Sequence, residues 1–267
     1  MSDSSWFEVV AFLPDPIVVP NDEARARMAA TKLAWKVRDR KTGIVMLLVA
    51  PGEFMMGSTA TERMVAVQSV PQEQREQYAE AVKSESRRLV TIARPFYLSE
   101  TEVSQEAWQN VMGANPSHFV EAQNPVEQVS WDDCQRFCKL SGLRLPSETE
   151  WEYACRAGTT TLFSFGSTIT HQQANHAATQ PVACGSLPAN PWGFREMHGN
   201  VWEWCEDSYQ AEASRTHDAV KGHSSDRVLR GGGWYAGIQS LRCANRGFGA
   251  PGFTNLSVGL RVARDPS

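Results

Sequence analysis

The sequence contains no apolar run of the roughly 18 residues that a membrane-spanning helix needs. Its first twenty residues carry no basic segment, and Pro and Asp interrupt their apolar part, so they do not resemble a signal peptide. Basic charge is not in excess either, since 26 Lys and Arg stand against 30 Asp and Glu. These absences argue against membrane insertion and against nucleic-acid binding, and they predict a cytoplasmic protein unless another route exports it.

The six cysteines form no CxxC pair and no dense framework of the kind that staples small secreted domains. We therefore expect them to be reduced and mostly buried. Cys134 and Cys138 lie four residues apart on an expected helix, and we predict that they share a buried apolar face. His171 and His176 lie five residues apart in a Gln- and Asn-rich loop, which is a weak metal signal.

Nineteen Gly and fourteen Pro indicate a loop-rich fold. We interpret residues 1–43 as an N-terminal extension, with helical composition from Asp22 to Arg40, and residues 44–267 as a single α+β domain. The apolar runs Ile44–Val49 and Glu53–Ser58 flank Pro51-Gly52 and are predicted to pair as a hairpin.

The segment from Thr61 to Arg88 is rich in Glu, Gln and Arg, which predicts either a solvated helix or a mobile insertion. Short strands are expected at 89–93 and 96–98. Three helices then follow, and each is announced by a serine cap: Ser104, Ser130 with Asp133, and Ser147 with Glu150. Beyond Gly158 the composition predicts long irregular segments.

Seven segments resemble, in order and spacing, the formylglycine-generating enzyme (sulfatase-modifying factor) family. They are GEFMMGS (52–58), PFYLSETEVSQEAW (95–108), NPVEQVSWDDCQRFC (124–138), RLPSETEWEYACRAG (144–158), HGNVWEWCEDSY (198–209), RVLRGGGW (227–234) and LRCANR (241–246). The resemblance implies a variant of the C-type lectin fold, which is α+β and loop-rich with few short helices and strands.

Catalytic members of that family oxidise a substrate cysteine with two cysteine thiolates, a natural site for a soft metal such as Cu(I). In those members the pair lies between the two last motifs. Here that interval, Tyr235–Ser240, contains no cysteine, and Cys243 matches a family cysteine outside the redox pair. The resemblance therefore implies that this chain is not an enzyme and requires no cofactor. The alternative is an oxidoreductase or other catalytic member that uses different residues.

Residues 227–263 also resemble the variable region of diversity-generating-retroelement variable proteins, members of the same fold family whose C-terminus is rewritten by adenine-directed reverse transcription. Agreement with their template needs no gap. The framework residues that match it are Gln239, Leu241, Arg242, Asn245, Arg246, Pro251, Gly259 and Arg261. We expect Gln239, Leu241, Arg242, Asn245 and Arg246 to hold the backbone, while the small and aromatic residues between them are interchangeable contacts.

Randomising both adenines of an AAC codon cannot yield Lys, Glu, Gln, Trp or Met, and no template-Asn position here holds one of these types. The predicted variable region spans residues 233–260. Its predicted ligand-binding residues are Tyr235, Ala236, Gly237, Ile238, Ser240, Gly247, Phe248, Gly249, Ala250, Gly252, Phe253, Thr254, Asn255, Leu256 and Ser257.

Aromatic residues among small ones are typical of antibody-like binding surfaces. The resemblance thus predicts a non-catalytic display protein that binds a ligand, expected to be a protein, through its diversified C-terminal region. A third hypothesis is an accessory domain that recognises one fixed partner, with residues 1–43 docking elsewhere.

Some family members bind calcium through the loop that here reads EMHGNVWE (196–203). The resemblance implies a Ca²⁺ site made by the side chains of Glu196 and Glu203 and the carbonyls of Gly199 and Val201, an all-oxygen set suited to a hard cation. The alternative is a hydrogen-bonded loop without metal.

Overall fold

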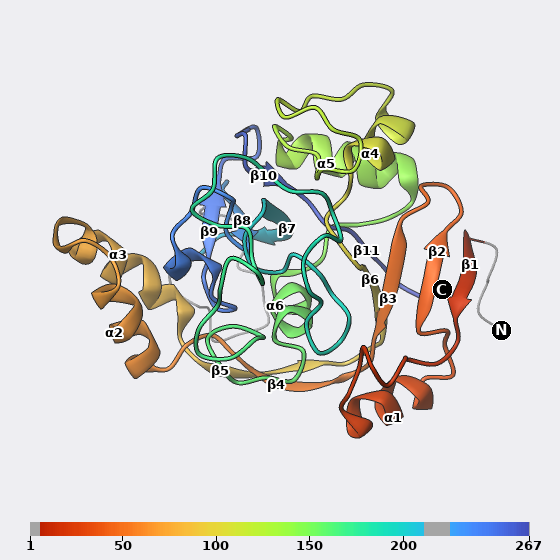
Figure 1. Cartoon of the computed structure of the whole chain (residues 1–267), viewed down its shortest axis with the longest axis horizontal. Helices are drawn as coiled ribbons and strands as arrows, with labels where there is room; N and C mark the ends of the chain where they lie inside the picture. The colour runs from red at the N-terminus through yellow and green to blue at the C-terminus, as the bar shows by residue number, and fades with distance from the viewer. Residues whose placement is uncertain (1–5, 211–224, 267) are drawn as a thin grey trace.

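The computed structural model describes residues 6–210 and 225–266, and its largest element is a five-stranded antiparallel sheet (Figure 1). The strand order is β1-β2-β3-β6-β11. The bounds are β1 Phe7–Ala11, β2 Lys36–Asp39, β3 Val45–Val49, β6 Phe96–Ser99 and β11 Ala263–Arg264. Strands β3 and β6 pair near the middle of the sheet and are almost fully buried. Strand β11 pairs with β6, so the C-terminal strand lies beside the first half of the chain.

Two smaller sheets complete the β-structure. One has four strands in the order β10-β7-β8-β9, and the other pairs β4 with β5. Their bounds are β4 Gly52–Met56, β5 Arg88–Ile92, β7 Trp202–Ser208, β8 Arg227–Arg230, β9 Gly247–Gly249 and β10 Val258–Gly259. The four-stranded sheet contains most of the regular backbone within the predicted variable region.

The predicted hairpin between residues 44–49 and 53–58 is wrong. Strand β3 pairs with β2 and β6, whereas β4 pairs with β5, which lies more than thirty residues further along the chain. Burial explains the difference: β3 is buried on both faces and occupies a sheet centre, but β4 alternates between half-buried and exposed positions. The chain turns at Pro51-Gly52 from one sheet into another.

A single helix over Asp22–Arg40 is also wrong. Helix α1 covers Asp22–Ala30 behind an Asn21 cap, and the chain then extends into β2. Pairing with β3 outweighs the helical composition of that stretch. Strands β1 and β2 thus belong to the same sheet as β3, so the division predicted at residues 43 and 44 does not coincide with a break in the sheet.

The helical alternative for residues 61–88 is the correct one. The segment contains helices α2 Ala60–Gln68 and α3 Arg75–Ala81 with the 3-10 turns η2 Gln72–Gln74 and η3 Val82–Glu85. In Figure 1 these helices lie on the side of the molecule next to the C-terminal loops.

All three serine-capped helices are confirmed: α4 Gln105–Met112, α5 Trp131–Ser141 and α6 Glu148–Arg156. Helices α4 and α5 pack through the stacked rings of Trp108 and Phe137, whose centroids are 5.1 Å apart. Cys134 and Cys138 are buried in this cluster, as predicted.

Beyond Ala157, the described residues contain no α-helix, and the short 3-10 turn η4 Ile238–Leu241 and strands β7 to β11 interrupt otherwise irregular chain. This agrees with the loop-rich composition. None of the helices in the described part of the chain combines the length and the apolar character that a membrane crossing requires.

Candidate ligand-binding surface

Buried arginines fix the irregular C-terminal segment to the helices beneath it. The side chain of Arg230 on β8 is fully buried and donates to the carbonyl oxygens of Cys243, at 2.8 Å, and Asn245. The same guanidinium pairs with Glu152 on α6. One side chain therefore replaces the backbone ladder that segment 243–245 lacks.

Arg242 makes a two-pronged ion pair with Glu85, at 2.7 and 2.9 Å, and both side chains are buried. Its Nε donates to the Gln239 carbonyl, and the Tyr78 hydroxyl donates to that carbonyl as well. Burial raises the pKa of Tyr78 above its ordinary value, although Arg242 opposes the shift. The helical segment from residue 60 to 85 therefore supports the base of the loop that contains η4.

Two more framework arginines are paired in the same way. Arg246 contacts Glu148 at 2.6 and 3.0 Å, and Arg261 contacts Glu203 at 2.6 and 2.8 Å. Burial alone would raise the pKa of Glu148, but Arg246 and Arg230 hold it below its usual value. Arg242 and Arg246 donate to backbone carbonyls, in agreement with the backbone-holding role predicted for them, and Arg261 makes contacts of the same kind that were not predicted.

Trp202 on β7 brings the parts of the predicted variable region together. Added methyl groups at Gly233 and Gly247 would both lie about 3 Å from its ring, at 3.0 and 2.9 Å. Its backbone N–H donates to the Ser257 carbonyl at 2.7 Å. Two stretches of the predicted variable region thus lie against one half-buried indole, and a third is hydrogen-bonded to the backbone of the same residue.

Most of the predicted ligand-binding residues are accessible. The larger side chains Tyr235, Phe248, Phe253 and Ile238 are 55%, 54%, 42% and 37% exposed. The small or polar positions that are exposed are Ala250, Gly252, Thr254 and Asn255, and the partly exposed positions are Gly237, Ser240, Gly247, Gly249 and Leu256. Ala236 and Ser257 are buried.

The framework residues have the opposite character. Leu241, Arg242, Asn245, Gly259 and Arg261 are buried, while the framework residues Gln239, Arg246 and Pro251 are partly exposed. Buried positions thus alternate with accessible ones along the stretch in nearly the pattern that the template comparison predicts.

Backbone conformation separates the glycines of this region into two groups. Gly231 and Gly232 have φ of +93° and +82°, which side-chain-bearing residues rarely adopt. The predicted variable glycines have no positive φ. Gly252 also has open space where a side chain would extend, so the backbone there does not require glycine.

The predicted calcium set is engaged in other contacts. Both oxygens of Glu196 accept backbone N–H groups, from Gly185 and Leu187 at 3.0 Å each. Glu203 accepts from the Trp151 indole at 2.6 Å and pairs with Arg261. Every oxygen of these two carboxylates already has a donor. The residues as placed therefore do not fit a calcium ion, because the carbonyls of Gly199 and Val201 alone are too few ligands.

The rings of His171 and His176 stack face to face, with centroids 4.1 Å apart and an interplanar angle of 12°. Parallel stacked rings direct their nitrogens sideways and not toward a common point, so this pair does not form a metal site by itself.

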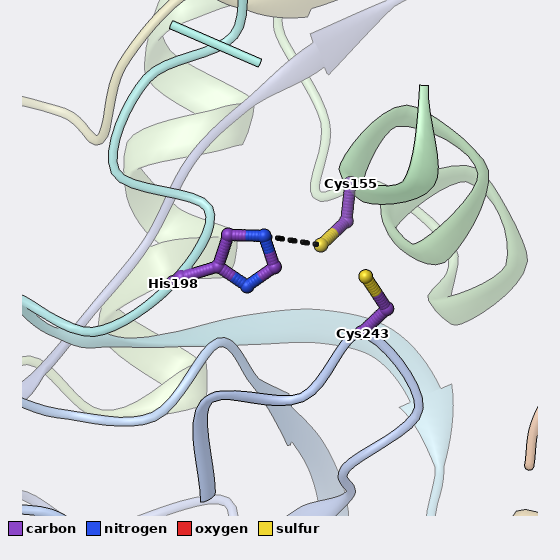
Figure 2. A group of neighbouring side chains, drawn as sticks. All are labelled: Cys155, His198 and Cys243. Carbon is purple, nitrogen blue, oxygen red and sulfur yellow. Dashed lines mark hydrogen bonds between the residues drawn. The ribbon is translucent and has the colours of Figure 1, made fainter. Parts of the chain in front are cut away.

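A different cluster lies beneath the surface and was not predicted. Cys155 on α6, His198 and Cys243 bring two sulfurs and one imidazole nitrogen within 4.8 Å of one another (Figure 2). All three side chains are buried. Segments more than 40 residues apart meet here, and the sequence offered no spacing signal for it.

A set of short helices and strands that supports a large loop-built surface defines this chain as an α+β protein of the C-type-lectin-like class with a formylglycine-generating-enzyme-type fold. The chain belongs to the FGE-sulfatase family, because the sulfatase-modifying factor enzyme 1-like domain matches residues 33–266.

Two relatives illustrate the family. The chain is 40% identical to the serine/threonine-protein kinase pkn1 of Chlamydia caviae over 151 residues, which cover 54% of this chain and 24% of that protein. It is 31% identical to mouse formylglycine-generating enzyme over 212 residues, which cover 70% of this chain and 55% of that protein. The chain thus spans only about a quarter to a half of these relatives.

Two solved structures share the fold. PvdO from Pseudomonas aeruginosa has a TM-score of 0.71 and 23% identity, covering 86% of this chain and 97% of that chain. Treponema denticola variable protein 1 has a TM-score of 0.67 and 23% identity, covering 83% of this chain and 95% of that chain. The fold class predicted from the sequence is confirmed.

The buried Glu85–Arg242 pair yields a stability prediction. Glu85→Gln leaves the Arg242 guanidinium buried without a countercharge, so we expect a loss of about 3–5 kcal/mol in the free energy of unfolding, measured by urea denaturation. Glu80→Gln is the matched control, because Glu80 pairs with Lys83 at the exposed surface of the same segment and should change stability by less than about 1 kcal/mol. Equal effects of the two substitutions would contradict the supporting role of residues 60–85.

The glycine geometry yields a second prediction. Gly232→Ala forces a left-handed residue and places its methyl group 2.9 Å from the Ser240 carbonyl oxygen, so we expect a loss of at least about 1–2 kcal/mol. Gly252→Ala should change the stability by less than about 0.5 kcal/mol, because the space beside it is open. Thermal unfolding of the two variants checks both values. If Gly252→Ala is strongly destabilised, the backbone at residue 252 does not accept a side chain, contrary to this prediction.

Proposed function

We propose that this chain is a ligand-binding display protein whose binding surface is formed by residues 233–260. The observation that carries the proposal is the contrast between two layers. Beneath the surface, framework arginines are held by buried carboxylates. Above them, large side chains such as Tyr235, Phe248 and Phe253 are exposed. A rigid base under interchangeable contacts is what a diversified binding site needs.

The exposed rings are held in ways that suit binding. Phe248 stacks on Tyr209 at 4.5 Å, and Tyr235 packs edge-on against Trp234 at 5.6 Å. The Trp234 indole in turn donates to the Leu256 carbonyl. Partly immobilised aromatic rings supply contact area at a small entropy cost, and the small residues between them leave room for a partner's side chains. A protein is the ligand class that best matches such a broad surface.

Diversification by a retroelement is the finer part of the proposal. The fold shared with Treponema denticola variable protein 1 supports it, together with the template agreement and the open space beside Gly252. A reverse-transcriptase gene near this one, with a near-copy of codons 233–260, is the expected finding when the surrounding DNA is sequenced. Absence of both would remove the case for active variation. The protein is proposed to act in the cytoplasm.

Likeness to mouse formylglycine-generating enzyme favours a second candidate, an oxidoreductase. The Tyr235–Ser240 interval contains no cysteine, so this candidate needs other thiols. Cys155 and Cys243 are both fully buried, which denies them a peptide substrate. We therefore propose that the chain does not oxidise peptide cysteines. Copper-dependent turnover of a Cys-containing peptide by the purified protein would overturn this.

A library experiment tests the display function. The library randomises the exposed predicted positions, which are Tyr235, Ile238, Phe248, Ala250, Gly252, Phe253, Thr254 and Asn255. It should give mostly folded proteins, because these side chains contribute little to the core, and selection against hen lysozyme as the probe should recover binders absent from the starting chain. Gly237, Gly247 and Gly249 are kept, since an added side chain there would meet neighbouring atoms at 3.0 Å or less. A matched library at the eight framework positions should yield mostly unfolded protein, as measured by protease resistance on the displaying particle. Folding losses of the same size in both libraries would contradict the two-layer arrangement.

A further inference from the structure

One edge of the five-stranded sheet is open and apolar. Strand β1 is the outermost strand in the order β1-β2-β3-β6-β11, and among the described strands it pairs with β2 alone. Large apolar side chains in and just after this strand are between 46% and 91% exposed, and they are Val9, Val10, Phe12, Leu13 and Ile17. An apolar patch of this kind marks an interaction surface, because isolated chains rarely leave so much apolar area in water.

The opposite edge of the same sheet is protected. Strand β11 is two residues long and carries the charged Arg264. It is also covered by Arg144, which exchanges two backbone hydrogen bonds with Ala263, at 2.9 and 2.7 Å. Short, charged or covered strands are the usual protection of a sheet edge against further pairing. Strand β1 lacks this protection, since it has five residues with no Lys, Arg or Pro and carries one charge, on Glu8.

The backbone of β1 presents hydrogen-bonding groups at the open edge. The Arg40 N–H donates to the Trp6 carbonyl oxygen, so the backbone of Trp6 faces β2. Groups alternate along a strand, and therefore the N–H and C=O of Val9 point away from β2. A bulge leaves Val10 without a register partner in β2, and residues 8–10 are all exposed.

We propose that a second copy of this chain pairs with β1 edge to edge, across a two-fold axis at Val9. Antiparallel pairing places Val9 opposite the partner's Val9, and the outward N–H and C=O of each residue bond to the other. In this register Phe7 lies opposite the partner's Ala11, and Glu8 lies opposite the partner's Val10. No charge meets a like charge, as a self-complementary interface requires. The two five-stranded sheets become one continuous sheet.

The residues beside the strand extend the contact. In the same register Phe12 lies opposite the partner's Trp6, and aromatic cross-strand pairs stabilise sheets. In its own copy the Trp6 ring packs edge-on against Phe7 and Tyr97, so its position is fixed. The five exposed side chains correspond to roughly 500 Å² per copy, and two copies would bury about 1,000 Å², the lower limit for a specific interface. We therefore expect a reversible dimer.

The pairing leaves the proposed binding surface open. In Figure 1, β1 lies at one side of the molecule, well separated from β8 and β9. A dimer joined at β1 would therefore carry two separate copies of the surface formed by residues 233–260. Two linked sites raise the apparent affinity for a ligand that repeats on a surface. The dimer itself does not depend on the display function, so the two can fail independently.

Sedimentation of the full chain in the analytical ultracentrifuge, from low to high micromolar concentrations, tests the pairing. We expect a monomer–dimer equilibrium without larger species. Val9→Lys places two ammonium groups opposite each other at the axis and should raise the dimer dissociation constant at least about tenfold. Val120→Lys is the matched control, because Val120 is also exposed but lies in the loop between α4 and α5, and it should leave the constant unchanged.

Val9→Cys gives a second measurement. Residues in a hydrogen-bonded antiparallel pair have Cα atoms about 5.5 Å apart, which is within the reach of a disulfide. Mild oxidation should therefore link the Val9→Cys chains into covalent dimers, whereas Val120→Cys should stay monomeric. The proposal is overturned if the wild-type chain remains a monomer or grows into larger species, if Val9→Lys leaves the dimer intact, or if the two cysteine variants cross-link equally.

Discussion

A buried guanidinium paired with a buried carboxylate is the interaction on which the C-terminal half depends. That half consists mainly of loops, so few backbone groups are satisfied by strand or helix partners. Arg230 and Arg261 donate to main-chain carbonyls with one part of the guanidinium and to a glutamate with another. Each side chain thereby replaces several ladder hydrogen bonds. Breaking such a pair leaves a buried charge uncompensated, which is far costlier than losing a surface pair.

The same constraint would allow the surface proposed to vary to change without loss of the fold. The carboxylates come from helix α6, strand β7 and the turn η3, all outside the variable region. Every buried charge of the base is therefore satisfied by residues that variation does not touch. The variable side chains add contacts above Trp202, and replacing them alters packing on one side of a half-buried ring. The proposed recognition would thus use different residues of the segment from those that hold the fold.

Local features of the sequence predicted the local structure. Each serine cap with its acidic partner fixed a helix start, because the signal and its effect lie within four residues. The framework of the variable region was predicted from its resemblance to a known template. The pairing partners of β3 and β4 were not predicted correctly. Whether β4 pairs with the adjacent β3 or with the distant β5 depends on the burial of the whole sheet, which local sequence does not show. The Cys155–Cys243 approach was missed for the same reason: two residues from distant segments meet only through the fold.

The position of the thiols links these observations. The interval between the last two motifs, where catalytic relatives are expected to carry their cysteine pair, here forms the exposed turn with Tyr235 and Ile238. The two thiols that do meet, those of Cys155 and Cys243, are fully buried. A reactive pair at the surface would be oxidised or would capture thiols, and it would restrict which residues could vary beside it. With Cys155 and Cys243 buried and no cysteine in residues 235–240, the exposed turn carries no thiol that would constrain the proposed contacts.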